Sequence, residues 1–232
     1  MIFTCTTGGI FAQVNPRTFA EYSAYVSEKY NITCKIPKNF IDLKYLEVWK
    51  FRQESFGAGF VFNPVIQSDN QECILMYPMI FNYISDSSKY ISKISQSIGR
   101  SMFKNKPSVD YGNDDLPRNN IKGQLRTVLG HLDNHGDIIR DSTFNFDDYV
   151  IVNAGKKVRK SFNADSVFIY DIPLKKAYKE KYVYCIGMVV TKKDRPYMQF
   201  MWLFTEEGEK KKDKYLKILS KKIWYNDNEQ RN

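Results

Sequence analysis

Residues 182–205 read YVYCIGMVVTKKDRPYMQFMWLFT, and this stretch decides the class of fold. Two runs rich in aromatic and branched residues, 182–191 and 197–205, flank the short polar link Lys192–Pro196. Aromatic and β-branched side chains favour strands, and a short polar link between two such runs is typical of a hairpin. The sequence therefore predicts two adjacent antiparallel strands in the last third of the chain.

Further strands and helices are expected on both sides of this hairpin. Apolar runs predict strands at 31–36, 45–52, 59–66, 73–81, 149–152 and 166–172. Helical spacing of apolar residues predicts helices over 18–29, from 85 to about 102, from 117 to 136, and over 206–224. The last of these has acidic residues first and lysines later, the order that the helix dipole favours. We predict an α+β protein with an antiparallel sheet flanked by helices in an α/β/α sandwich.

The segment 32–40, ITCKIPKNF, joins an expected strand to a Pro-x-x-aromatic sequence. This opening resembles that of PsbP-like and DcrB-like domains, and the closing hairpin and helix, from Tyr182 to Trp224, are similar to the way that fold ends. The resemblance implies an antiparallel sheet between helices, and it implies binding of partners rather than catalysis, as in most members. A pattern-level resemblance over about two thirds of the chain does not specify a ligand.

The first residues predict the compartment. Met1–Ala12 reads MIFTCTTGGIFA, carries no charge and is followed by Gln13. This resembles the apolar region and cleavage end of a secretory signal peptide without its basic start, although a short apolar strand is an alternative. We interpret residues 1–13 as a truncated signal peptide and 14–232 as a single domain. No later stretch is long and apolar enough for a transmembrane helix, so we expect a secreted or periplasmic protein.

Composition excludes a disordered chain, because 43% of the residues are hydrophobic and 16 Phe and 16 Tyr are present. The net charge of +9 is uneven: residues 1–115 hold 12 basic and 11 acidic residues, and the remainder holds 23 and 15. Basic runs occur at 156–160, 175–181 and 210–214. They form either a solvated surface or a face for an anionic partner.

From the first of these runs we predict a partner-binding site at Lys156, Lys157, Arg159 and Lys160. The expected partner is an envelope protein or an anionic glycan or lipid surface. No nucleic-acid-binding module accompanies the basic runs, so nucleic acid is not expected as a partner. The sequence leaves the oligomeric state open.

The two histidines, His131 and His135, are the candidate metal ligands. A spacing of four places both imidazoles on one side of a helix, which suits two ligands of a divalent metal ion. However, no Glu follows His131 and no third ligand is identified, so the HExxH motif is absent. Alternatively, both residues satisfy the end of a helix, where its dipole favours them.

Catalytic signatures such as a phosphate-binding glycine loop or a GxSxG elbow are absent from the sequence. The leading hypothesis is therefore a non-enzymatic binding domain without a cofactor. The alternatives are a metal-dependent hydrolase that uses His131 and His135, and a structural interaction domain of a larger assembly. Cys34, Cys73 and Cys185 lie in apolar runs, which predicts buried free thiols, with a Cys34–Cys73 disulfide left open.

Overall fold

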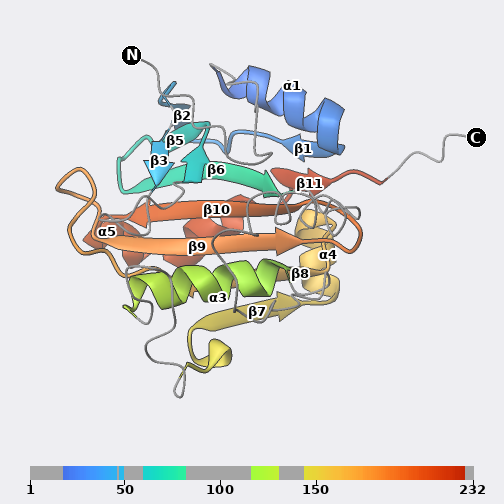
Figure 1. Ribbon diagram of the computed structural model, residues 1–232. Helices are drawn as coiled ribbons and strands as arrows, with labels where there is room; N and C mark the ends of the chain where they lie inside the picture. The colour runs from blue at the N-terminus through green and yellow to red at the C-terminus, as the bar shows by residue number, and fades with distance from the viewer. Residues whose placement is uncertain (1–17, 46, 50–59, 82–115, 131–143, 228–232) are drawn as a thin grey trace, which may run out of the picture.

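The computed structural model of the protein describes residues 18–45, 47–49, 60–81, 116–130 and 144–227. A seven-stranded sheet with the strand order β2-β5-β6-β10-β9-β8-β7 forms its centre, and all neighbouring strands are antiparallel (Figure 1). The strands are β2 (Phe40–Asp42), β5 (Val65–Ser68), β6 (Cys73–Phe81), β10 (Tyr197–Phe204), β9 (Tyr184–Thr191), β8 (Ser166–Asp171) and β7 (Val150–Ala154). This confirms an α+β fold built on an antiparallel sheet.

The predicted hairpin is the middle of this sheet. β9 and β10 pair in register from Met198 opposite Val190 to Phe204 opposite Tyr184, and β6 pairs with the other side of β10. Every residue of β10 is buried. A strand covered on both faces has no solvent side, which explains why its sequence is a continuous apolar run rather than an alternating one.

Helices cover both faces of the sheet. On one face lie α1 (Phe19–Tyr30), α4 (Lys156–Phe162), α6 (Lys212–Ile218) and the paired strands β1 (Ile32–Cys34) and β11 (Ile223–Tyr225). On the other face lies α3 (Leu116–Val128), in front of the sheet in Figure 1, and its Ile121 and Leu125 share a buried cluster with sheet residues such as Phe168 and Val189. Each face has its own buried cluster of apolar side chains, so the predicted arrangement, an antiparallel sheet with helices on both faces, is confirmed.

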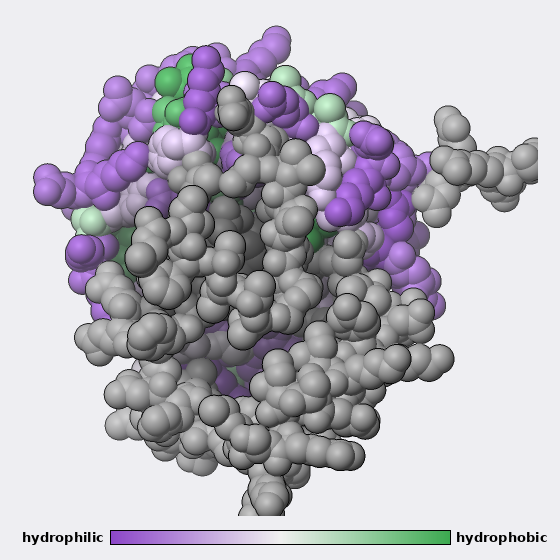
Figure 2. Space-filling view, turned by 45° about the horizontal axis from the view of Figure 1, so that its top comes forward, coloured by the Kyte–Doolittle hydropathy of each residue, from purple (hydrophilic) through white to green (hydrophobic). Residues whose placement is uncertain are grey.

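The smaller elements lie at the ends of the sheet. They are the short pair β3 (Glu47–Trp49) and β4 (Phe60–Phe62), the 3-10 turn η2 (Phe146–Asp148) and the one-turn helix α5 (Glu206–Glu209). In the view from above α1, the described surface is mostly hydrophilic, with small separate hydrophobic areas (Figure 2). None of the helices in the described parts has the length and apolar character that a membrane span requires.

Helix α1 begins and ends as its sequence indicates. Thr18 and Glu21 form a capping box, in which each side chain accepts a hydrogen bond from the other residue's backbone N–H. Asn31 ends the helix in the left-handed conformation, at φ 52°. The buried side of α1 consists of Phe19, Tyr22, Val26 and Tyr30, the apolar spacing that predicts this helix.

The prediction of one helix over 206–224 is wrong. Two short helices, α5 and α6, occupy its first part, and β11 pairs antiparallel with β1, with Thr33 opposite Trp224. Ile223 and Tyr225 are fully buried against the α1 face of the sheet. The tertiary contacts of these β-favouring residues therefore outweigh the helical pattern of the preceding lysine-rich segment.

Other boundaries differ from the prediction in smaller ways. The expected strand at 59–66 is two strands, β4 and β5, divided at Asn63-Pro64. Proline has no backbone N–H and interrupts a ladder, which gives the division a physical cause. Helix α4 and strand β2 were not predicted. The helix expected from 85 to about 102, and the end of the helix expected at 136, lie outside the described residues.

Candidate functional site

Helix α4 presents the predicted partner-binding residues on the outside of the molecule. Val158 and Phe162, one turn apart, are buried in the apolar cluster of the α1 face. The four cationic residues of the helix, Lys156, Lys157, Arg159 and Lys160, are all exposed. Within the described residues, none of their side chains has an ion pair or a hydrogen bond. The structure therefore brings together four cations without internal partners, which we call the α4 cation face.

The start of α4 does not favour positive charge. Gly155 caps the helix without a side-chain hydrogen bond, at φ 84°, and the first turn contains Lys156 and Lys157 but no acidic residue. The dipole of a helix disfavours cations at this end, so the two lysines weaken the helix slightly. Packing of Val158 and Phe162 holds α4 in place instead. Arg159 and Lys160 lie in the last turn, where the dipole favours cations, so only the two lysines at the start are unfavourable for the local structure.

The second basic run, 175–181, lies in the connection between β8 and β9 and is partly engaged there. Lys179 Nζ donates to the Tyr45 hydroxyl over 2.7 Å and lies 4.4 Å from the centroid of the Tyr45 ring. Lys181 Nζ donates to Oε1 of Gln71 over 3.2 Å. The hydroxyl of Tyr178 donates to Glu47 beside them. Lys179 and Lys181, two of the four lysines in this run, thus hold the connection against Tyr45 and the turn before β6.

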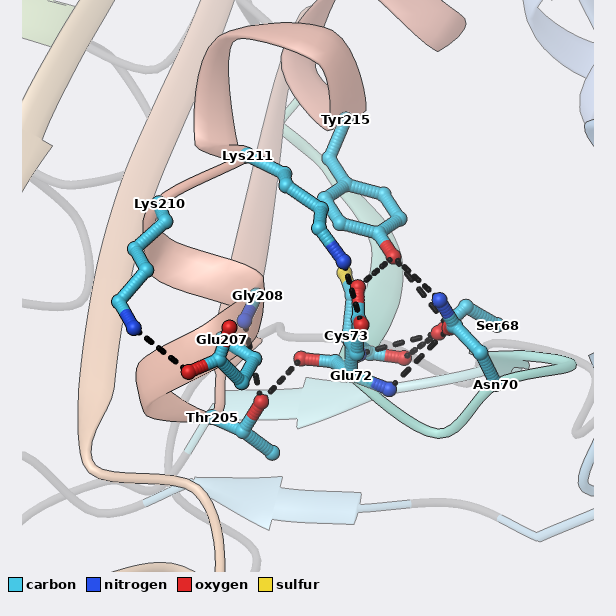
Figure 3. A network of polar contacts seen from close by, with 10 residues as sticks. All are labelled: Ser68, Asn70, Glu72, Cys73, Thr205, Glu207, Gly208, Lys210, Lys211 and Tyr215. Carbon is cyan, nitrogen blue, oxygen red and sulfur yellow. Dashed lines mark hydrogen bonds and ion pairs between the residues drawn. The ribbon is translucent and has the colours of Figure 1, made fainter.

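The third basic run, at the junction of α5 and α6, is neutralised by carboxylates of the same protein. Lys210 Nζ lies 2.6 Å from Oε1 of Glu207, and Lys212 Nζ lies 2.7 Å from Oε1 of Glu209. Lys211 Nζ lies 2.6 Å from Oε1 of Glu72, in the turn between β5 and β6. Figure 3 shows Lys211 and Tyr215 directed toward Glu72, with Lys210 paired to Glu207 beside them. The first three of the four lysines in this run therefore have carboxylate partners within the protein.

Glu72 connects this junction to the sheet. Its second carboxylate oxygen accepts a 2.8 Å hydrogen bond from the Tyr215 hydroxyl, and its backbone oxygen accepts the N–H of Thr205 over 3.0 Å. The hydrogen-bonded Lys211 ammonium, with the Tyr215 hydroxyl as a smaller cause, lowers the pKa of the Glu72 carboxyl below its ordinary value. The group stays ionised near neutral pH. This arrangement is a structural clamp, and we call it the Glu72 clamp.

Gly208 permits the close approach on which the Glu72 clamp depends. A Cβ atom at this position would lie 2.2 Å from the backbone oxygen of Glu72. No side chain except hydrogen fits there without displacement of the backbone. A groove of about 310 Å³ lies beside the clamp. It is lined by β2 and the two residues before it, by the β5–β6 turn and by α6, and Lys38, Asn70 and Lys214 are among its residues.

A buried polar cluster lies beneath α3, and sequence reasoning missed it. The Tyr170 hydroxyl donates to Oε1 of Gln124 over 2.7 Å, and the amide groups of Gln124 and Gln199 bond to each other over 2.9 and 3.0 Å. The Tyr170 ring lies over Gly187, where a Cβ would approach it to 2.3 Å. Burial raises the pKa of Tyr170, so the phenol stays neutral. The members of this cluster satisfy one another and position α3, and a lone Gln199 inside an apolar strand was the only sequence signal.

The predicted metal ligands His131 and His135 lie outside the described residues, so the metal hypothesis stays a prediction. Elsewhere in the described part of the chain, no group of three or more His, Cys, Asp or Glu side chains is placed to hold a metal ion. Cys34, Cys73 and Cys185 are buried and free, as predicted, without a Cys34–Cys73 disulfide. Burial raises the pKa of each thiol, which leaves them protonated and poor nucleophiles.

Comparison with family models, curated proteins and solved structures finds no match to this chain. The likeness to PsbP-like and DcrB-like domains therefore stays a prediction from the sequence pattern. Within this chain, the α4 cation face differs from the basic run at the Glu72 clamp, where carboxylates neutralise the lysines.

Proposed function

We propose that this protein is a non-enzymatic binding domain that contacts an anionic partner through the α4 cation face. One observation carries the proposal: all four cations of the face are exposed, and no carboxylate in the described residues pairs with them. Like charges this close repel one another, and two of them also oppose the helix dipole. The two lysines at the start of the helix, Lys156 and Lys157, therefore gain most when an external anion neutralises their charge.

The shape of the face favours an extended partner over a small anion. A seven-residue helix is about 10 Å long, and the cations are spread along its outer side. α4 itself exposes no aliphatic or aromatic side chain, because Val158 and Phe162 point into the core. Peripheral membrane helices combine cations with such exposed apolar groups. We therefore favour an acidic protein surface over a lipid surface.

The compartment is part of the same proposal. If residues 1–13 are an export signal, as their apolar composition predicts, the partner is a component of the cell envelope or a secreted protein. Appearance of the protein in the periplasmic or secreted fraction, with loss of residues 1–13 measured by mass spectrometry, supports this location. An intact Met1 in the cytosolic fraction contradicts it.

The test compares two variants of equal net charge. Lys156→Gln, Lys157→Gln, Arg159→Gln and Lys160→Gln together remove the face. The matched control removes four exposed lysines that have no ion pair in the described structure: Lys175→Gln, Lys176→Gln, Lys193→Gln and Lys214→Gln. Binding is measured on immobilised polyglutamate and on vesicles of phosphatidylglycerol and phosphatidylcholine in equal parts.

We expect the wild type and the control variant to bind polyglutamate with an affinity that falls as salt rises. The face variant should bind at least about tenfold more weakly, because electrostatic affinity follows the number of cations engaged. Equal binding by the two variants contradicts a role of α4. Binding to vesicles alone would assign the face to a lipid surface instead.

A further inference from the structure

The two edges of the seven-stranded sheet differ in how they are protected. At one edge, β2 has only three residues and ends at Asp42. The Asp42 carboxylate accepts hydrogen bonds of 2.9 Å from the backbone N–H groups of Phe19 and Lys44, which ties the start of α1 to this edge. Short edge strands that carry charge discourage pairing with another chain. This edge is therefore protected against pairing with a strand of another chain.

The opposite edge, β7, has none of these protections. Its sequence VIVNA contains no charge and no proline, and among the described strands it pairs with β8 alone. Every residue after Val150 is exposed, with 66% exposure at Ile151 and 41% at Val152. Successive side chains point to opposite faces of a sheet, so apolar groups are exposed on both sides of this edge. No strand of the described residues pairs with the outer side of β7, and an edge of this kind is a template for another strand.

The charges that flank β7 are complementary to each other. Asp147 and Asp148 precede the strand and are exposed, and Lys156 and Lys157 follow it and are exposed. Asp147 lies 3.7 Å from Arg118, and Asp148 accepts a 3.0 Å hydrogen bond from Asn145. An antiparallel neighbour of the same sequence runs in the opposite direction. The acidic end of one strand then meets the basic end of the other.

We propose that β7 pairs antiparallel with β7 of a second copy of this chain, across a twofold axis, so that the two sheets become continuous. A twofold contact uses the same surface on both copies, which requires this kind of self-complementarity. A register centred on Val152 places Ile151 opposite Asn153 of the second copy. The same antiparallel direction places η2, with Asp147 and Asp148, towards the start of α4, with Lys156 and Lys157, of that copy.

This inference goes beyond the proposed function and does not depend on it. Arg159 and Lys160 lie one turn further along α4, on the part of the cation face that the second copy leaves open. Pairing of one five-residue strand buries little surface, so we expect a salt-sensitive dimer with a Kd on the order of tens of micromolar.

The first experiment measures the mass of the protein by sedimentation over a range of concentrations without any polyanion. Ile151→Lys puts a charge on the β7 edge, and we expect it to abolish the dimer. The control is Ile41→Lys, which places the same charge at an isoleucine of 52% exposure on the β2 edge and should leave the dimer intact. A wild type that is monomeric at millimolar concentration overturns the proposal, as does equal behaviour of the two variants.

A charge exchange tests the register. Asp148→Lys alone and Lys156→Asp alone should each weaken the dimer at least about tenfold, because each creates two like-charge contacts across the twofold axis. The double variant should restore wild-type association, since each new lysine then lies near a new aspartate. Failure of the double variant to recover would rule out the register. The variant Arg159→Gln with Lys160→Gln should keep the dimer. Loss of anion binding in that variant is then distinguished from loss of the dimer.

Discussion

Two lysine-rich segments of this protein have similar sequences and opposite surroundings. KKVRK at 156–160 forms the α4 cation face, where the described residues provide no carboxylate partner. KKK at 210–212 lies at the Glu72 clamp, where each ammonium is within 2.7 Å of a carboxylate oxygen. The difference teaches that the composition of a basic run does not decide its role. Neighbours in space decide it, and the partner of Lys211 lies 139 residues away in the chain.

The largest effect on stability should come from the closest contact in the clamp. Gly208→Ala places a methyl group 2.2 Å from the backbone oxygen of Glu72, so α5 must move away from the β5–β6 turn. We expect the free energy of unfolding in urea to fall by about 2–3 kcal/mol. The control is Gly123→Ala in α3, where nothing lies within 4 Å. It should be neutral or stabilising by up to about 1 kcal/mol, and an equal loss in both variants would contradict the role of the contact.

Glu72→Gln should lower the free energy of unfolding by a smaller amount. The change removes the charge at the centre of the clamp and weakens the bond from the buried Tyr215 hydroxyl, which should cost about 1 kcal/mol for that bond. Glu207→Gln is the matched control, because its side chain is 63% exposed whereas that of Glu72 is 18% exposed. Exposed ion pairs contribute little, so the control should show no measurable change in urea unfolding.

The effect of Glu72→Gln on the free energy of unfolding should depend on pH. The hydrogen-bonded Lys211 keeps the pKa of Glu72 in the folded protein below its unfolded value, so ionised Glu72 stabilises the fold above the unfolded pKa of about 4.3. This contribution is lost as the pH falls through the lower folded pKa. The stability difference between wild type and Glu72→Gln should therefore shrink between about pH 5 and pH 3. A difference that stays constant over this range would show that the charge of Glu72 is not involved.

The smallest effect on stability is expected at the α4 cation face. Replacement of its four cations by glutamine removes no ion pair in the described structure and relieves the unfavourable charge at the start of the helix. The urea midpoint should stay the same or rise slightly, although polyanion binding is lost. A clear loss of stability would mean that these cations have partners within the protein, and the contrast with the clamp would fail.

Local patterns predicted most elements of the fold. The β9–β10 hairpin follows from two aromatic runs and a polar link, and the run Cys73–Phe81 matches β6 at both ends. Helix α1 follows from its apolar spacing. Val158 and Phe162 give α4 the same apolar spacing of four residues, but four cations among its seven residues hide this helical pattern. These features depend on neighbours in the sequence, and sequence patterns report such neighbours directly.

The candidate site required contacts between distant residues. The α4 cations are predicted as a binding face from their charge, a feature that the run at 210–214 shares, and only the position of carboxylates such as Glu72 separates the two. Likewise, the sequence places Ile223 and Trp224 in a helix, because nothing in the sequence around them shows that β1 lies beside them.

The sequence by itself thus determined the fold class, the central hairpin and the presence of excess positive charge. Only the tertiary structure decided which lysines are neutralised, which edge of the sheet is left open at β7, and that Thr33 and Asn226 lie within 3.0 Å although 193 residues separate them. The physical reason is the distance along the chain over which each effect acts. Periodicity and propensity act over one or two turns or strands, whereas burial and charge pairing depend on which segments meet after folding.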